Sequence, residues 1–175
     1  FEWWTRKNEK WRKATNEIYG DASLSPDEKT AKSALVMLEQ AKHGEDYMVR
    51  LEQAAESIGH ESPFPDRVKR GIERQYAHDH IRLLQRLADD KIDVEEFKKR
   101  QTDMYAREQA QEKLHNIGYD PADKKLVRIQ QKYEQAVAAA KGAFSGGGAS
   151  WSKANAKIKR LEAAYNKKLA QFEKV

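Results

Sequence analysis

Apolar residues near the end of this chain recur with a strict seven-residue period, at Trp151, Ile158, Tyr165 and Phe172. A sustained period of seven is typical of an α-helix that supercoils with a partner helix. The segment that opens at Asp120-Pro121 carries its own apolar stripe, at Leu126, Ile129, Tyr133, Ala136 and Ala140. We therefore expect residues 119–175 to form an antiparallel, coiled-coil-like hairpin, whose loop contains the run Gly146-Gly147-Gly148.

Turn and capping signals divide the remainder of the chain into further helices. Gly20 is expected to end the first helix in a left-handed conformation. Ser25 and Glu28 have the spacing of a capping box for the second helix, and His43-Gly44 is expected to break or kink it. Asp93 is placed to cap a later helix. These signals predict an all-α chain of about seven helices with little β-structure.

The composition indicates a thin hydrophobic core. Hydrophobic residues make up 39% of the chain and charged residues 35%, whereas ordinary globular domains are ~45–50% apolar and ~25% charged. Each helix can then offer only a narrow apolar stripe to its neighbours, which favours an elongated bundle. We expect three segments in one continuous structural unit: Trp-rich helices over residues 1–60, a central hairpin over residues 61–118, and a basic hairpin over residues 119–175.

The sequence holds few signals for location. It contains no run of ~18 apolar residues, so no transmembrane segment is expected. It contains no cysteine, which excludes disulfides and thiolate metal sites and is compatible with both reducing and oxidising compartments. The first residues, Phe-Glu-Trp-Trp, include no initiator methionine and no signal-peptide pattern. We expect a fragment of a longer polypeptide or a processed product, and no compartment is indicated.

The patterns that usually mark enzymes and metalloproteins are incomplete here. Glu112 and His115 have the Glu-x-x-His spacing of di-iron bundles, but no second such pair exists in the sequence. His78 and His80 are two residues apart and would point to different faces of a helix. The glycines at 146–148 lack the Lys-Ser/Thr of a phosphate-binding loop. We expect no catalytic residues, no metal site and no cofactor.

Positive charge is concentrated at the end of the chain. Residues 141–175 contain eight Lys/Arg and two acids, whereas the whole chain has a formal net charge of +5. The candidate nucleic-acid or partner contacts are Lys153, Lys157, Arg160, Lys167 and Lys168. The competing interpretation is an ordinary solvated face, because the neighbouring aromatic residues belong to the seven-residue stripe and should be buried. Trp3, with basic residues around it, is a further candidate contact, for a membrane interface or a partner.

Residues 84–99, Leu-Gln-Arg-Leu-Ala-Asp-Asp-Lys-Ile-Asp-Val-Glu-Glu-Phe-Lys-Lys, resemble the small helix-turn-helix module called SHOCT. That resemblance implies a Leu-rich helix, a turn, and a second helix that opens with Glu-Glu-Phe, and it implies no chemistry. More loosely, the long polar helices with Trp and Ala stripes look like segments of tailed-phage internal or tape-measure proteins, a similarity of style.

Taken together, these features predict a non-enzymatic structural or interaction protein that presents helix faces to a protein partner or to copies of itself. One alternative is a nucleic-acid-binding helical module that uses the basic C-terminal hairpin. A second alternative is a membrane-surface or translocation-associated protein, for example of the phage internal virion type, that uses the Trp-rich first helix.

Overall fold

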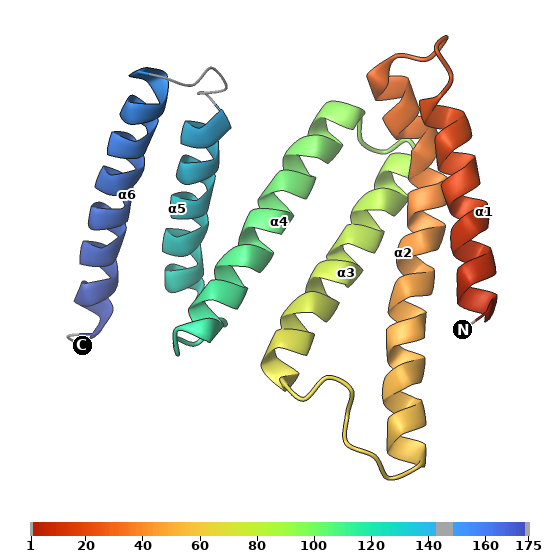
Figure 1. Ribbon diagram of the computed structural model, residues 1–175, viewed down its shortest axis with the longest axis horizontal. Coiled ribbons are helices and arrows are strands. Elements are labelled where there is room, and N and C mark those ends of the chain that lie inside the picture. The colour runs from red at the N-terminus through yellow and green to blue at the C-terminus, as the bar shows by residue number, and fades with distance from the viewer. Residues whose placement is uncertain (1, 143–148, 174–175) are drawn as a thin grey trace. The chain divides into compact units, whose positions relative to one another are not determined.

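The fold is described from a computed structural model, which covers residues 2–142 and 149–173 of the chain. These residues form six α-helices and no strand. The expected glycine-rich loop at Gly146–Gly148 lies outside the described residues. The helices run over the following residues (Figure 1): α1 Glu2–Tyr19, α2 Pro26–Ser57, α3 Arg67–Ala88, α4 Val94–Asn116, α5 Lys124–Gly142 and α6 Ala149–Glu173.

Contacts between residues group the chain into two compact units, residues 1–104 and 105–175. The boundary falls inside α4, so the first half of this helix belongs to one unit and the second half to the other. The all-α class expected from the sequence is confirmed, with six described helices in place of about seven. The division into three sequence segments stays a prediction.

In the first unit, α2 packs against both α1 and α3. Its core gathers aliphatic residues of α2 and α3 around one aromatic ring of α4, with these buried members: Ala34, Leu38, Leu83, Leu84, Leu87 and Phe97. Phe97 is only 2% exposed, and Ile92 packs against the same cluster from the turn before α4. Residues 84–99 therefore form a tight helix-turn-helix, in which Asp90 takes a positive φ of 60°.

In the second unit, α5 and α6 lie side by side, and the second half of α4 joins them. The buried cluster consists of Ala110, Leu114, Leu126, Val127 and Leu169, with Tyr119 and Tyr165 packed against it. Among the α6 residues whose side chains are described, Ala154 and Leu169 are buried, while Ile158 and Tyr165 of the seven-residue stripe, and Leu161 beside them, are only half-buried. Trp151 and Phe172 have side chains outside the described residues.

The break expected at His43-Gly44 does not occur, because α2 continues unbroken from Pro26 to Ser57. A glycine inside a helix costs ~1 kcal/mol relative to alanine. Packing offsets this cost: His43 is buried, and its ring meets the edge of Trp11 of α1 at a centroid distance of 5.0 Å. Tertiary contact therefore overrides the local signal.

The predicted N-terminal caps of α2 and α4 are confirmed. Ser25 accepts a hydrogen bond from the Glu28 amide at 3.1 Å, and the Ser25 amide donates to the Glu28 carboxylate, which completes the capping box. Asp93 accepts from the Glu96 amide at 2.8 Å. Gly20, by contrast, does not adopt the expected left-handed conformation: the glycines with positive φ are Gly59 and Gly118 among the residues described. A Cβ at Gly20 would lie 2.9 Å from the Asn16 carbonyl oxygen, so close approach explains this glycine.

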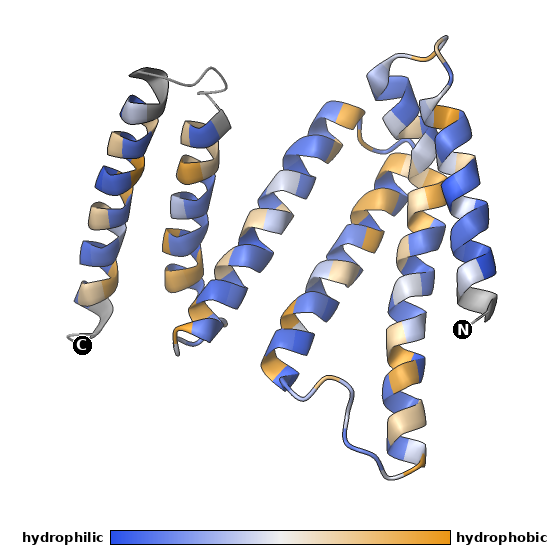
Figure 2. Ribbon diagram, viewed as in Figure 1, coloured by the Kyte–Doolittle hydropathy of each residue, from blue (hydrophilic) through white to orange (hydrophobic). Residues whose placement is uncertain are grey.

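Every described helix contains both hydrophobic and hydrophilic residues, and no described helix is hydrophobic throughout (Figure 2). In agreement, none of the helices in the described part of the chain is both long enough and apolar enough to span a bilayer. For the described residues, this agrees with the prediction that the chain has no transmembrane segment.

Candidate functional site

A groove of about 310 Å³ runs between α5 and α6 in the second unit. It is lined by two tyrosines, by four further apolar residues and by three cations: Tyr133, Tyr165, Ile129, Ala136, Leu161, Ala164, Arg128, Lys132 and Lys168. Apolar residues from both helices reach it because each helix carries its stripe toward the other. We refer to these nine residues as the α5–α6 groove.

The floor of the α5–α6 groove is built on a pair of stacked tyrosines. The rings of Tyr133 and Tyr165 lie 4.5 Å apart between centroids, with 15° between their planes. Burial raises the pKa of Tyr165 to about 12, assisted by the negative charge of Glu134. Burial likewise raises the pKa of Tyr133. Both phenols are therefore neutral at physiological pH, so they supply contact surface and carry no charge.

The rim of the groove is positively charged. Arg128 and Lys132 lie one turn apart on α5, Lys168 lies on α6, and all three are exposed. No carboxylate lines the groove, and none of the three cations forms an ion pair with any residue that the structure describes. The rim thus holds three unpaired positive charges around an apolar floor.

Two carboxylates outside the groove lining act on the tyrosines, the exposed Glu162 of α6 and Glu134 of α5, and Glu134 is already engaged. Glu134 accepts hydrogen bonds from Lys113 of α4 and, at 3.0 Å, from the Gln130 side-chain amide. Gln130 is itself only 3% exposed. These contacts hold Glu134 toward α4, so it does not neutralise the groove rim.

The structure places all five basic candidates from the sequence on the exposed surface of α6, but it brings only one of them into the groove. Lys168 lines it, whereas Lys153, Lys157, Arg160 and Lys167 do not. The side chain of Trp3 lies outside the described residues. The sequence interpretation missed Arg128 and Lys132, whose signal was their i,i+4 spacing beside the apolar stripe of α5.

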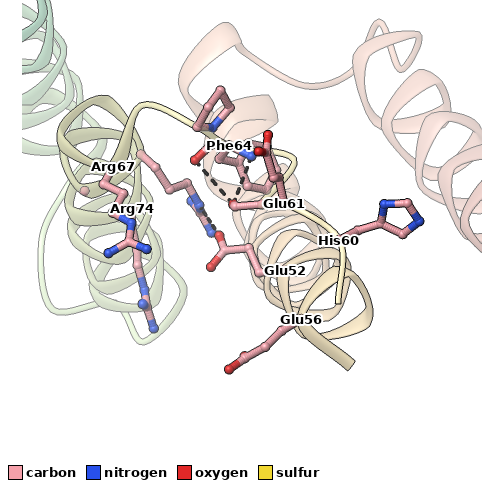
Figure 3. A pocket seen from close by; sticks show the side chains of 11 residues that line it. Glu52, Glu56, His60, Glu61, Phe64, Arg67 and Arg74 are labelled. Carbon is pink, nitrogen blue, oxygen red and sulfur yellow. Dashed lines mark hydrogen bonds and ion pairs between the residues drawn. The ribbon is translucent and has the colours of Figure 1, made fainter. Parts of the chain in front are cut away.

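A larger crevice, of about 780 Å³, opens in the first unit between α2, α3 and the loop that joins them (Figure 3). Arg67, Arg70 and Arg74 reach it from α3, and Glu52 and Glu56 reach it from α2. Gly71 leaves the wall open between the arginines, since a Cβ there would meet nothing within 4 Å. His60 projects away from the arginines in Figure 3. We refer to this feature as the α2–α3 crevice.

The buried charge of the α2–α3 crevice is paired within the fold. Arg70 donates to Glu52 at 2.6 Å and to Glu45 at 3.1 Å, and the side chains of Arg70 and Glu45 are only 10% and 11% exposed. Burial alone would lower the pKa of Arg70, but its hydrogen bonds to the Glu52 and Glu45 carboxylates and their negative charge outweigh this effect and raise the pKa above its ordinary value. Arg74 lies 3.7 Å from Glu45, and the Phe64 ring lies 5.2 Å from the Arg70 guanidinium carbon.

The histidines that stood out in the sequence have structural neighbours. His78 lies 3.9 Å from Glu45, at the edge of the arginine network. His80 contacts the Gln101 amide at 3.3 Å and stacks on Tyr76, and burial lowers its pKa. In the part of the chain that the structure describes, no group of three His, Cys, Asp or Glu side chains is arranged to hold a metal ion.

The described residues thus define an all-α protein with a crevice whose buried arginine is paired and a groove whose three rim cations form no ion pair with described residues. Comparisons with protein-family models, with curated proteins and with solved structures find no match to this chain.

Proposed function

We propose that this chain is a non-enzymatic helical interaction protein, of the scaffold or assembly kind, that presents helix faces to a protein partner or to a second copy. The observation that supports this proposal is the α5–α6 groove. Its floor combines apolar and aromatic side chains that are only half-buried, and its rim carries cations without partners. Aromatic residues and arginine are enriched where proteins bind one another.

The seven-residue period of α6 supports a finer structural proposal, that α5 and α6 pack as a coiled-coil-like hairpin. The two helices of such a hairpin leave a furrow on each side of their line of contact, and a furrow whose apolar residues stay half-exposed is available to a further helix. The half-burial of Ile158, Leu161 and Tyr165 is in keeping with a stripe that two helices alone do not cover.

A nucleic-acid-binding module is the second candidate. It is favoured by the basic residues of α6, because Lys153, Lys157 and Lys167 are exposed and form no ion pair with residues in the described ranges. Phosphates are bound by such clusters, and the binding weakens steeply with salt as counterions are released.

One experiment separates the two candidates: a gel-shift titration with duplex DNA at ~50 mM salt and micromolar protein, where even non-specific binders register. We expect no complex. A complex that is lost in the variant Lys153→Gln with Lys157→Gln and Arg160→Gln would replace the interaction proposal by the nucleic-acid one. Light scattering after size exclusion, run in parallel, measures whether the chain associates with itself.

A further inference from the structure

The shape of the α5–α6 groove suits a helix. Two helices that lie side by side leave a furrow along their line of contact, and a third helix packs into it with its own apolar stripe. Ala136 on α5 and Ala164 on α6 both line the furrow. Because alanine side chains are short, a third helix can approach α5 and α6 closely at these two positions.

The charge of the rim determines the chemistry of the occupant. Arg128, Lys132 and Lys168 surround the apolar floor, and no carboxylate lines the groove. A basic or neutral helix would leave these cations unpaired, and a basic one would be repelled. A helix whose apolar stripe is flanked by Asp and Glu would cover the floor and pair the rim at the same time.

The same geometry disfavours nucleic acid as the occupant of this groove. Stacking of bases requires an accessible aromatic face. Tyr133 and Tyr165 already stack on each other and are half-buried. Phosphates placed on the three cations would leave Ile129 and Leu161 exposed, so the apolar part of the groove would contribute nothing.

We propose that the α5–α6 groove is a docking site for an acidic amphipathic helix of a partner protein. The inference rests on the proposed function and deepens it, by naming the site and the class of ligand. The apolar floor supplies affinity, and the rim selects acidic over basic helices and steers the encounter.

The proposal is tested by fluorescence anisotropy with labelled model peptides of ~20 residues, long enough to form a helix. The first peptide carries leucines at helical spacing flanked by glutamates, the second has the same composition in scrambled order, and the third replaces glutamate by lysine. We expect saturable binding of the first peptide alone, weaker at ~200 mM than at ~50 mM salt because the rim charges are exposed.

Two matched variants locate the binding. Lys132→Glu with Lys168→Glu reverses two rim charges and should weaken binding of the acidic peptide about tenfold or more. Lys141→Glu with Lys159→Glu changes the net charge equally at exposed positions that do not line the groove, and should change the affinity less than about twofold. Ala164→Gln, at an exposed position, fills the furrow without changing charge and should also weaken binding. Far-ultraviolet circular dichroism checks that each variant remains helical.

The outcomes separate this inference from the proposed function. Equal binding of the scrambled acidic peptide, or equal losses in the two charge variants, would overturn the docking site in favour of non-specific attraction. Self-association that is lost in Lys132→Glu with Lys168→Glu would identify a second copy as the occupant and overturn the partner helix, while the interaction function stands. Binding of duplex DNA without any peptide binding would overturn both.

Discussion

The α2–α3 crevice and the α5–α6 groove both place cations beside aromatic rings, but the cation nearest the ring in the crevice is buried and paired, whereas the cations of the groove are exposed and form no ion pair with the residues described. In the crevice, Arg70 is largely buried and is paired with Glu45 and Glu52. In the groove, Lys132 and Lys168 are exposed, and no carboxylate lines the site. A charge that is removed from water must be paired inside the fold, whereas an exposed charge needs no partner for the fold to form.

This contrast suggests that the crevice stabilises the fold and that the groove is available to a partner. The larger cavity is the less promising binding site, because Arg70, the buried cation of its wall, is already paired with Glu45 and Glu52 by the hairpin that forms it. The smaller groove offers both an uncovered apolar floor and unpaired charge, which are the features that a partner can use. Size alone would have selected the wrong region.

The largest expected effect comes from breaking the pair in the crevice. Arg70→Met leaves Glu45, which is 11% exposed, without its main partner. Breaking a buried ion pair typically costs ~3–5 kcal/mol, so the free energy of unfolding in urea should fall by about that amount. The double variant Arg70→Met with Glu45→Gln should recover part of the loss, because the more deeply buried of the two carboxylates that Arg70 pairs is then no longer charged. A loss below ~1 kcal/mol for Arg70→Met would show that the network is not structural.

A second comparison sets a core leucine against a groove leucine. Leu84 is 0% exposed in the first unit, so Leu84→Ala should lower the free energy of unfolding by ~2–5 kcal/mol. Leu161 is only half-buried on the groove floor, so Leu161→Ala should cost ~1 kcal/mol, below the range of a true core site. Urea unfolding followed by circular dichroism measures both. Equal losses would mean that the groove floor belongs to the core.

Acid should destabilise the first unit through His43. Burial, together with the nearby positive charge of Lys7 and Arg50, lowers the pKa of His43 in the folded state, against an opposing effect of Asp46. Above the unfolded pKa of ~6.5 both states hold neutral His43, so its full contribution to stability is present. As pH falls below ~6.5 the unfolded chain takes up the proton more readily, and stability is lost down to the folded pKa. Unfolding free energies at a series of pH values should show this loss in the wild type and a smaller one in His43→Leu.

Alkali should act on the second unit in the opposite direction. The pKa of Tyr165 is raised to about 12, so the folded state favours the neutral phenol. Its contribution is complete below the unfolded pKa of ~10 and is lost as pH rises from there toward the folded value. A tyrosinate absorbance titration should contain a late-ionising tyrosine, and Tyr165→Phe should remove it. If the titration of Tyr165→Phe matches that of the wild type, the tyrosine pair is not buried as described.

Local features of this fold could be predicted from the sequence, and features that depend on helix register could not. The capping box at Ser25 involves residues three positions apart, so its signal is complete within one turn. The pair of Arg70 with Glu45 joins residues 25 positions apart and exists only once α2 and α3 have docked. The expected break at His43-Gly44 failed for a related reason, since the packing of His43 on Trp11 is invisible to local propensity.

The candidate site was predicted only in part for the same reason. The basic residues of α6 were visible as a charge cluster, and Lys168 does line the groove. The opposite rim, Arg128 and Lys132, lies on another helix, and its relation to Lys168 depends on how α5 and α6 pack. A charge count along one helix therefore identifies a basic face, but it does not show which of its residues lie beside a groove on the neighbouring helix.

Urea unfolding of the variant Lys132→Gln with Lys168→Gln tests the claim that the groove cations are not required by the fold. Both side chains are exposed and form no ion pair with the residues that the structure describes. The free energy of unfolding should therefore stay within ~0.5 kcal/mol of the wild-type value, as for ordinary surface substitutions. A loss of ~2 kcal/mol or more would place these lysines among the interactions that hold the fold, and would contradict the claim.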